Sequence, residues 1–103
     1  MLRGQVVRAH FGNLDEPKLF VVVSNNVRNR VLGSVLAARL TTTRKPVIPS
    51  IVEIPAQEGV HGRLVCDDIE VLYQEDVIEV LTGLTPKTME AVDRGVAAAL
   101  GLH

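Results

Sequence analysis

The chain has 103 residues, a length that suits one domain, and 47% of them are hydrophobic, which excludes a disordered chain. No apolar run approaches the ~20 residues that a membrane-spanning helix needs, and the first residues, MLRGQVV, lack the apolar stretch of a signal peptide. We therefore expect a single domain over residues 1–103 with no membrane segment, and the lone Cys66 favours a reducing cytoplasm.

Charge is unevenly distributed along the chain, although the formal net charge is only −1. Residues 1–45 contain eight basic and two acidic residues, a net charge of +6, whereas residues 46–103 contain three basic and ten acidic residues, a net charge of −7. A basic half facing an anion would suit a phosphate-rich ligand. Two ordinary solvated surfaces would explain the same pattern.

Short β-branched runs predict the strands of the first half. Residues 4–11, 18–23 and 34–41 each combine apolar, strand-forming residues with a polar segment that follows. A turn is expected over residues 12–17, which are rich in Gly, Asn, Asp and Pro. Residues 25–33 show no strand alternation and are too few for an independent helix, so we expect a loop with room for one helical turn.

The second half continues with strands and ends in a helix. Residues 47–54 predict a strand whose Pro49 indicates an edge position or a bulge. Residues 63–73 predict one bent strand or two short ones, interrupted at Asp67 and Asp68. A last short strand is expected over residues 78–82.

The terminal helix has clear start and stop signals. Thr85 is a typical N-cap with Pro86 at the first helical position, and Gly101 is a typical C-cap. Its apolar stripe predicts packing against a core and consists of Met89, Val92, Val96, Ala99 and Leu100. Together the elements predict a mainly β fold, a small, strongly bent barrel of antiparallel strands with one C-terminal helix.

Cations and hydroxyls gather at the ends of two predicted strands. Arg39 and Thr41 should share a face of the strand over residues 34–41, and Lys18 opens the strand before it. The same region continues with Thr42, Thr43 and Arg44, and Asp67 lies on a separate strand break. Such groups can stabilise charge on a phosphoryl centre, and RNA cleavage without a metal needs little more, because the 2′-OH is a built-in nucleophile. A polar barrel rim without chemistry is the plainer interpretation.

Other kinds of site have weaker support. Cys66, Asp67 and a histidine could in principle bind a metal, and Ser24 or Cys66 could act as a nucleophile, but no spacing favours either. A phosphate-binding glycine loop is absent. Aromatic residues are too scarce for a base-stacking platform.

The whole chain resembles the MazF/PemK (Kid-like) toxins of bacterial toxin–antitoxin modules. The similar segments follow one another in the family's order and are Arg3–Val6, Lys18–Asn25, Asn29–Arg30, Val35–Thr42, Val65–Ile69 and Leu84–Leu102. Each segment is unspecific by itself, and their order, spacing and coverage carry the resemblance. The mycobacterial branch is the most similar, since it also carries SNN-x-RNR and RLTTTR.

The resemblance implies an SH3-like barrel that forms a homodimer and cleaves single-stranded RNA at specific sequences without a metal or other cofactor. Its substrates would be mRNA and, in some members, tRNA or rRNA, and its products 2′,3′-cyclic phosphate and 5′-OH ends. A cognate MazE-like antitoxin would cover the RNA groove. Mapped by motif, the catalytic residues are Lys18, Thr41 and Asp67. The residues expected to bind RNA are Asn25, Arg28, Arg30, Arg39, Thr42, Thr43 and Arg44.

The chain also departs from the family pattern. Lys18 stands where the family has arginine, and a lysine offers a point charge in place of a two-pronged donor. We hypothesise that Arg39 supplies the second phosphate contact. The loop over residues 12–17 is short, and Asp68 replaces a glutamine. Two alternatives therefore stay open: a CcdB-like toxin that binds DNA gyrase, and an inactive barrel that binds RNA or an antitoxin.

Overall fold

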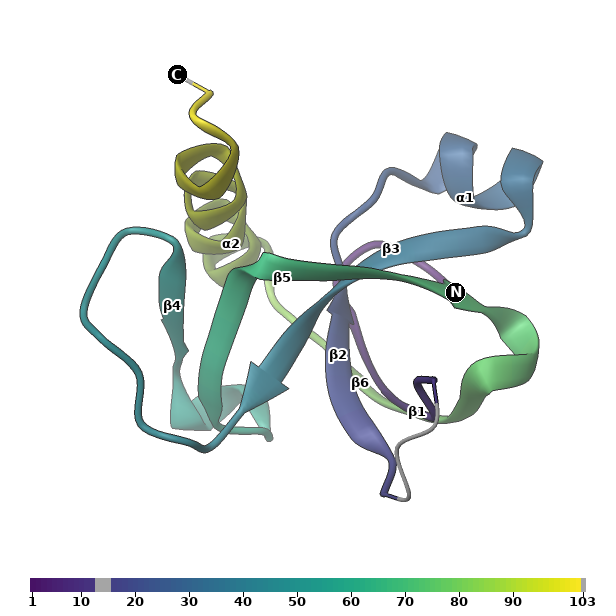
Figure 1. The fold of residues 1–103 in the computed structure, drawn as a ribbon, viewed down its shortest axis with the longest axis horizontal. Helices are drawn as coiled ribbons and strands as arrows, with labels where there is room; N and C mark the ends of the chain where they lie inside the picture. Colours follow the sequence, from purple (N-terminus) through teal and green to yellow (C-terminus); the bar gives the residue numbers. More distant parts are fainter. Residues whose placement is uncertain (13–15, 103) are drawn as a thin grey trace.

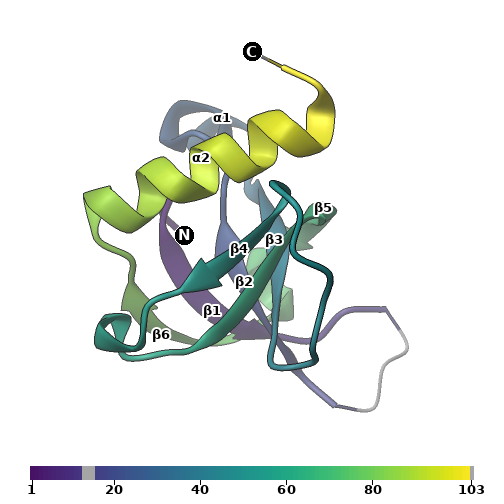
Figure 2. The same ribbon diagram turned by 90° about the vertical axis from the view of Figure 1, so that its left-hand side faces the viewer.

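The computed structural model describes residues 1–12 and 16–102. Within these residues six antiparallel strands form one strongly curved sheet in the order β4-β5-β3-β2-β1-β6, and α2 lies across it (Figures 1 and 2). The strands are β1 (Gln5–Ala9), β2 (Lys18–Val22), β3 (Ser34–Thr41), β4 (Ile51–Ile54), β5 (Gly62–Tyr73) and β6 (Val77–Gly83). The helices are α1 (Asn26–Leu32) and α2 (Pro86–Leu100), with 3₁₀ turns η1 (Ala56–Glu58) and η2 (Gln74–Asp76). The expected mainly β fold with a C-terminal helix is confirmed.

Both faces of the sheet are buried in its centre. One face packs under α2, where Val21, Ala38 and Leu64 meet Val92 of the helix. The other face is the concave side of the curved sheet and buries a second cluster: Val7, Ala9, Phe20, Val22, Val35, Ala37 and Leu72. Because successive residues of a strand point to opposite faces, β2 and β3 contribute to both clusters and read as continuous apolar runs.

The best predicted elements are β3 and α2. The structure places β3 at Ser34–Thr41, as expected from its sequence. At the start of α2 the Thr85 side chain accepts a hydrogen bond from the Thr88 N–H, and Gly101 ends the helix with a left-handed φ of 73°. The prediction that Leu100 belongs to the buried apolar stripe is wrong, because this side chain is 60% exposed.

Residues 25–33 are a correction to the sequence-based expectation. They form a complete helix, α1, in place of a loop with one helical turn. The Asn25 side chain accepts a hydrogen bond from Arg28 N–H at the start, and Gly33 adopts φ 67° at the end. A seven-residue helix is marginal by itself, so capping at both ends and packing on β3 must stabilise it.

The fourth strand is shorter than expected. β4 covers only Ile51–Ile54, because Pro46 and Pro49 remove donors that strand pairing over residues 46–50 would need. β5 is one strand with a bulge at Asp67 and Asp68, which confirms the bent-strand alternative. The turn expected over residues 12–17 lies partly outside the described residues.

A buried carboxylate fixes the start of α2 to η1. Glu58 is 7% exposed and accepts hydrogen bonds from the Thr85 N–H at 3.1 Å and the Thr85 hydroxyl at 2.7 Å, and from the hydroxyl of Thr88. These hydrogen bonds, first that of Thr88, hold the pKa of Glu58 below its usual value. A negative charge at this place also complements the positive end of the helix dipole. No helix in the described part of the chain is long and apolar enough to cross a membrane.

Candidate functional site

The predicted catalytic pair meets at one end of the β2–β3 hairpin. Leu19 pairs with Leu40, so Lys18 and Thr41, one step further out, stand opposite each other on the other face of the sheet. Lys18 opens β2 and Thr41 closes β3, and both are partly exposed. Strand pairing thus brings together two residues that are 23 positions apart in the sequence.

Arg63 lies beside this pair, although it was not among the site residues predicted from the sequence. It pairs with Thr41 on one side and with Glu53 of β4 on the other. Its Nε lies 3.0 Å from Glu53 Oε1, and its Nη1 donates to the Thr42 carbonyl at 3.3 Å. Glu53, Arg63, Thr41 and Lys18 therefore form one row across four neighbouring strands, which we call the rim row. Only the strand register could have revealed it.

Arg39 lies one step inward from the rim row, on the same face. It pairs with Phe20 of β2 and Val65 of β5, two apolar neighbours. Its buried Nε has no hydrogen-bond partner among the described residues, and it takes part in none of the ion pairs found there. A buried donor without a partner costs about 1–3 kcal/mol, and such a donor can be completed by a water molecule or by a ligand.

The hydroxyl of Thr41 is oriented by the chain that follows it. The Thr43 N–H donates to Thr41 Oγ1 at 3.1 Å. With an acceptor position of the oxygen filled, the hydroxyl hydrogen can be donated outward. Thr42, Thr43 and Arg44 are themselves exposed beyond the end of β3. The basic and hydroxyl-bearing residues that the sequence singled out here therefore do lie around one place.

The bulge of β5 places the acidic residues of the site. Val65 pairs with Arg39 and Ile69 with Ala38, so the residues between them, Asp67 included, have no partner on β3. Asp67 is exposed in this bulge. Along the sheet, Arg39 lies between Thr41 and the bulge. Asp67, the acidic residue predicted to act as or assist the general base, therefore lies on the Arg39 side of the site and is not a member of the rim row.

A second acidic group near the bulge was not expected. Glu70 pairs with Ala37 and so lies on the face of Arg39. Burial raises the pKa of the Glu70 carboxyl, and a hydrogen bond to Asp68 together with the charge of Asp68 raises it further. A carboxyl group of this kind holds its proton to higher pH than an exposed glutamate does. Sequence spacing alone could not show this, because it depends on the bulge.

Cys66 belongs to the core. It is fully buried under α2, where a Cβ added to Gly95 would lie only 2.7 Å from its Sγ. Burial and the nearby Asp67 raise the pKa of the Cys66 thiol to about 11, which keeps it neutral. These surroundings favour a packing role over the nucleophile or metal ligand that the sequence left open.

Asn25, Arg28 and Arg30 lie at the opposite end of β2 and β3, on or next to α1. Asn25 caps the helix, and Arg28 Nη1 donates to the Ser34 carbonyl at 2.6 Å. Arg30 is exposed. Within one subunit the structure does not bring these three residues together with Lys18 and Thr41.

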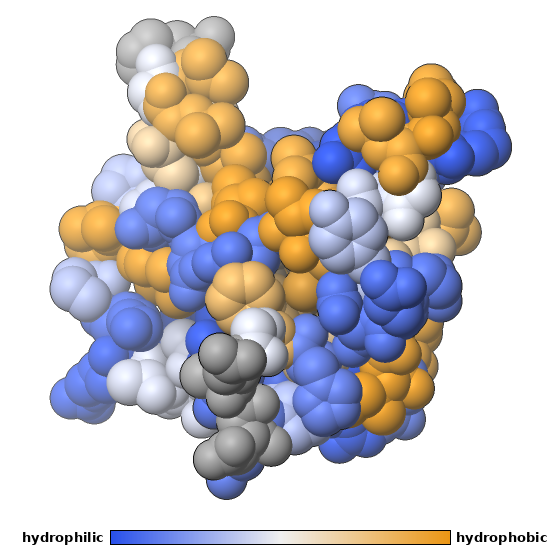
Figure 3. All heavy atoms as spheres, turned by 45° about the vertical axis from the view of Figure 1, so that its right-hand side comes forward, coloured by the Kyte–Doolittle hydropathy of each residue, from blue (hydrophilic) through white to orange (hydrophobic). Residues whose placement is uncertain are grey.

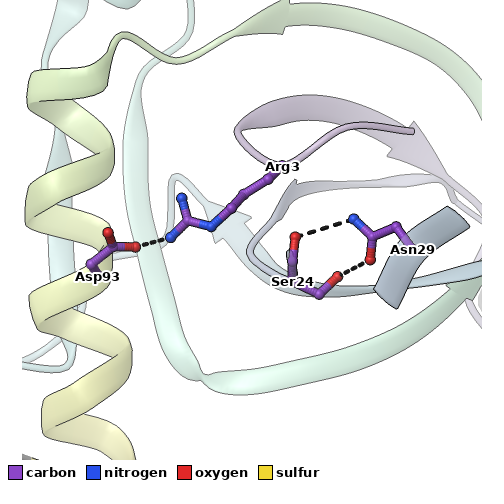
Figure 4. Close-up of polar contacts among 4 residues, drawn as sticks. All are labelled: Arg3, Ser24, Asn29 and Asp93. Atoms are coloured by element: carbon purple, nitrogen blue, oxygen red, sulfur yellow. Dashed lines mark hydrogen bonds and ion pairs between the residues drawn. The ribbon is translucent and has the colours of Figure 1, made fainter. Parts of the chain in front are cut away.

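The Ser24–Asn29 pair beside them is an internal support (Figure 4). The Ser24 hydroxyl donates to Asn29 Oδ1, and Asn29 Nδ2 donates to the Ser24 carbonyl at 3.1 Å. Ser24 Oγ also accepts from Leu36 N–H at 2.9 Å. Both residues are buried, so this network ties α1 to the sheet. Figure 4 also shows the Arg3–Asp93 ion pair, which links the N-terminal segment to α2.

Comparison with known proteins agrees with this fold. The family described as PemK-like, MazF-like toxin of type II toxin–antitoxin system matches residues 2–100. The chain therefore belongs to the PemK/MazF toxin family. It is 41% identical to Endoribonuclease MazF1 of Mycobacterium bovis and to Endoribonuclease MazF4 of Mycobacterium tuberculosis, in each case over 98% of this chain and 93% of the relative.

Solved structures show the same relationship. A mycobacterial endoribonuclease in complex with its cognate antitoxin is 40% identical, with a TM-score of 0.91 over 100% of this chain and 97% of that one. A second mycobacterial endoribonuclease is 39% identical, with a TM-score of 0.88 over 99% and 92%. MazF from a MazE–MazF complex of Deinococcus radiodurans, at 24% identity and a TM-score of 0.81, shares the fold.

Proposed function

We propose that this chain is the toxin of a type II toxin–antitoxin system and a sequence-specific endoribonuclease that cleaves single-stranded RNA without a metal. The observation that carries the proposal is the rim row, in which Lys18, Thr41 and Arg63 stand side by side next to Arg39. Three cations and a hydroxyl at the same end of neighbouring strands can supply the charge stabilisation that a phosphodiester needs. The family match supports this function over the gyrase-binding and inactive alternatives.

The chemistry follows from these groups. The ribose 2′-oxygen attacks the adjacent phosphorus, a new 2′-O–P bond forms, and the P–O5′ bond breaks. Arg39 and Arg63 hold the non-bridging oxygens, and the Thr41 hydroxyl donates a hydrogen bond to one of them. The proton of the 2′-OH passes to Asp67, and Lys18 gives a proton to the leaving 5′-oxygen. The products are a 2′,3′-cyclic phosphate and a 5′-OH.

Arg39 has a defined part in this proposal. Because Lys18 offers only a point charge, the site lacks the two-pronged contact that an arginine at that position would give. The guanidinium of Arg39, with a buried Nε that has no partner among the described residues, supplies it. Phosphate binding would complete that donor. The exposed Arg44, Thr42 and Thr43 would hold the RNA beyond the cleaved bond.

Two partners belong to the proposal. A homodimer is supported by apolar side chains that project from α1 and from the end of β5: Val27, Val31, Leu32, Val71 and Tyr73, each at least 43% exposed. Figure 3 shows hydrophobic side chains gathered on α1. Patches of this kind typically mark protein contacts. A MazE-like antitoxin would neutralise the dimer, and both would act in the cytoplasm, where mRNA is translated.

The test is incubation of the purified protein with a long RNA of mixed sequence in EDTA, followed by mapping of the 5′ ends. Discrete 5′-OH ends should appear with the natural chain and disappear with Thr41→Ala. A folded Thr41→Ala variant that cuts at the natural rate would remove Thr41 from the mechanism. Intact RNA at micromolar natural protein would overturn the ribonuclease itself.

A further inference from the structure

A hollow of about 350 Å³ adjoins the rim row at its β4 end. The segment after β3 forms one wall with Arg44, Lys45 and Val47, and the sheet forms the other with Ile51, Glu53 and Arg63. Its volume falls within the range of about 300–1,000 Å³ that is typical of small-molecule sites.

The hollow is continuous with the site of cleavage. Arg63 belongs to both, since it pairs with Thr41 on β3 and with Glu53 on β4. Ile51 and Glu53 are two residues apart on β4, so they share the face that carries Thr41 and Lys18. Neighbouring strands lie about 4.8 Å apart. The hollow therefore begins one strand beyond Thr41, within reach of a nucleotide next to the bound phosphate.

The lining offers both an apolar surface and polar edges. Val47 and Ile51 supply apolar surface for the flat face of a base. Arg63 is held at two points, by Glu53 Oε1 at 3.0 Å and by the Thr42 carbonyl at 3.3 Å, so its guanidinium plane is fixed before any ligand arrives. Arg44 and Lys45 add positive charge at the mouth, where the RNA backbone would pass.

Glu53 is the one acidic side chain among the residues that line the hollow. Its side chain is 71% exposed, and Oε1 is the oxygen that faces Arg63. A carboxylate accepts hydrogen bonds only, so it pairs with the amino group of cytosine, adenine or guanine. Uracil presents a carbonyl oxygen at the position where cytosine carries its amino group, and two acceptors would then face each other.

We propose that this hollow is a base-reading subsite, in which Glu53 and Arg63 select an amino-bearing base over uracil at one position beside the cleaved phosphate. This inference rests on the proposed ribonuclease function and adds to it a determinant of the cut sequence. Arg63 is shared between the two: it holds phosphate on its Thr41 side and orients Glu53 on its β4 side. Glu53 itself stays outside the chemistry of bond cleavage.

The experiment compares Glu53→Gln with the natural chain on a randomised RNA library, with 5′ ends mapped by sequencing. Glutamine keeps the shape of glutamate but can also donate a hydrogen bond, so it accepts uracil. We expect roughly a tenfold loss of discrimination against uracil at one flanking position, with preferences elsewhere unchanged. Glu79→Gln is the matched control, because Glu79 forms an ion pair with Arg8 on the opposite edge of the sheet.

The outcomes separate the subsite from the activity. An RNA library left intact by the natural chain would contradict the proposed function. Cleavage by Glu53→Gln with the natural preferences at every position would overturn the subsite and leave the ribonuclease standing. A folded variant whose rate falls equally at all sites would place Glu53 in positioning the phosphate contacts and would also overturn the subsite. Restoration of uracil discrimination by Glu53→Asp would support it further.

Discussion

The two ends of the β2–β3 hairpin differ in how their polar groups are satisfied. At the α1 end, Ser24 and Asn29 are buried and bonded to each other and to the strand. At the other end, Arg39 keeps a buried Nε without a partner among the described residues, next to Lys18 and Thr41. Satisfied buried networks stabilise the fold, whereas a buried donor that has no protein partner is free to bond water or a ligand. The same hairpin thus carries its structural support and its proposed chemistry at opposite ends.

Charge removal at the two ends should give the largest contrast. Lys18→Ala should lower the single-turnover rate of RNA cleavage about a hundredfold or more, because the leaving oxygen loses its proton donor and the phosphate loses a cation. Arg30→Ala, at the exposed surface of α1, should change the rate less than threefold. Equal effects of the two variants, measured on one RNA, would remove the distinction between the ends.

Arg39 should come next in size. Arg39→Ala should lower cleavage at least tenfold, since the phosphate loses a charge-assisted contact. Thermal melting should show little loss of stability, because the variant also removes a buried donor that has no partner among the described residues. If Arg39→Ala keeps full cleavage while Lys18→Ala abolishes it, Arg39 does not supply the second phosphate contact.

The α1 end should respond in stability and not in rate. Asn29→Ala leaves the Ser24 hydroxyl and carbonyl without their partner and should reduce the free energy of unfolding by about 2–3 kcal/mol. Urea denaturation gives this value. Cleavage per folded molecule should stay near the natural level, and a loss that matches Lys18→Ala would show that the network also serves the site.

Glu58 gives a pH-dependent test away from both ends. Its pKa is lowered in the folded chain, so its stabilising effect is present above the ordinary value of 4.5 and is lost as the pH falls through the lowered pKa. Glu58→Gln should remove about 1–2 kcal/mol near neutral pH, since a charged acceptor of several hydrogen bonds becomes neutral. As the pH falls through the lowered pKa of Glu58, the stabilities of the two chains should converge, which chemical denaturation across pH can measure.

Glu70 should show the smallest effect and the opposite sign. Its pKa is raised, so its stabilising effect is complete below the ordinary value of 4.5 and is lost as the pH rises through the raised pKa. Glu70→Gln should therefore be slightly more stable than the natural chain at pH 7, and the difference should vanish at pH 4. A variant that is less stable at pH 7 would show that the charged carboxylate has a stabilising partner.

The helices and strands that were predicted correctly are those whose first and last residues are marked by local sequence signals. Thr85 and Gly101 indicated the limits of α2, and the apolar residues between Val35 and Leu40 indicated those of β3. The helix α1 was not predicted, although Asn25 and Gly33 cap it. A helix of this length depends on packing against β3, and the spacing of apolar residues in the sequence does not show that packing. The strand predicted over residues 47–54 was too long, because Pro49 within it prevents strand pairing of the first residues despite their hydrophobicity.

The candidate site was predictable only in part for a related reason. Lys18, Arg39 and Thr41 could be found because two of them alternate on one strand and the third opens the strand before it. Arg63 and Glu53 belong to the site because β3 pairs with β5 and β5 pairs with β4. Glu70 lies near the site because of the bulge in β5. Register depends on how the whole sheet folds, so no window of the sequence contains it.

The segment between β3 and β4 has a consequence for how such a toxin changes over generations. Residues 42–49 are all exposed, pair with no strand and contribute nothing to either core. Substitutions there alter the wall of the hollow while the fold keeps nearly all of its stability. Related chains can therefore differ in this wall, beside the proposed base-reading pair Glu53 and Arg63, while they keep the same cleavage chemistry. A change in the RNA sequence that is cut then needs no compensating substitution elsewhere to keep the fold stable.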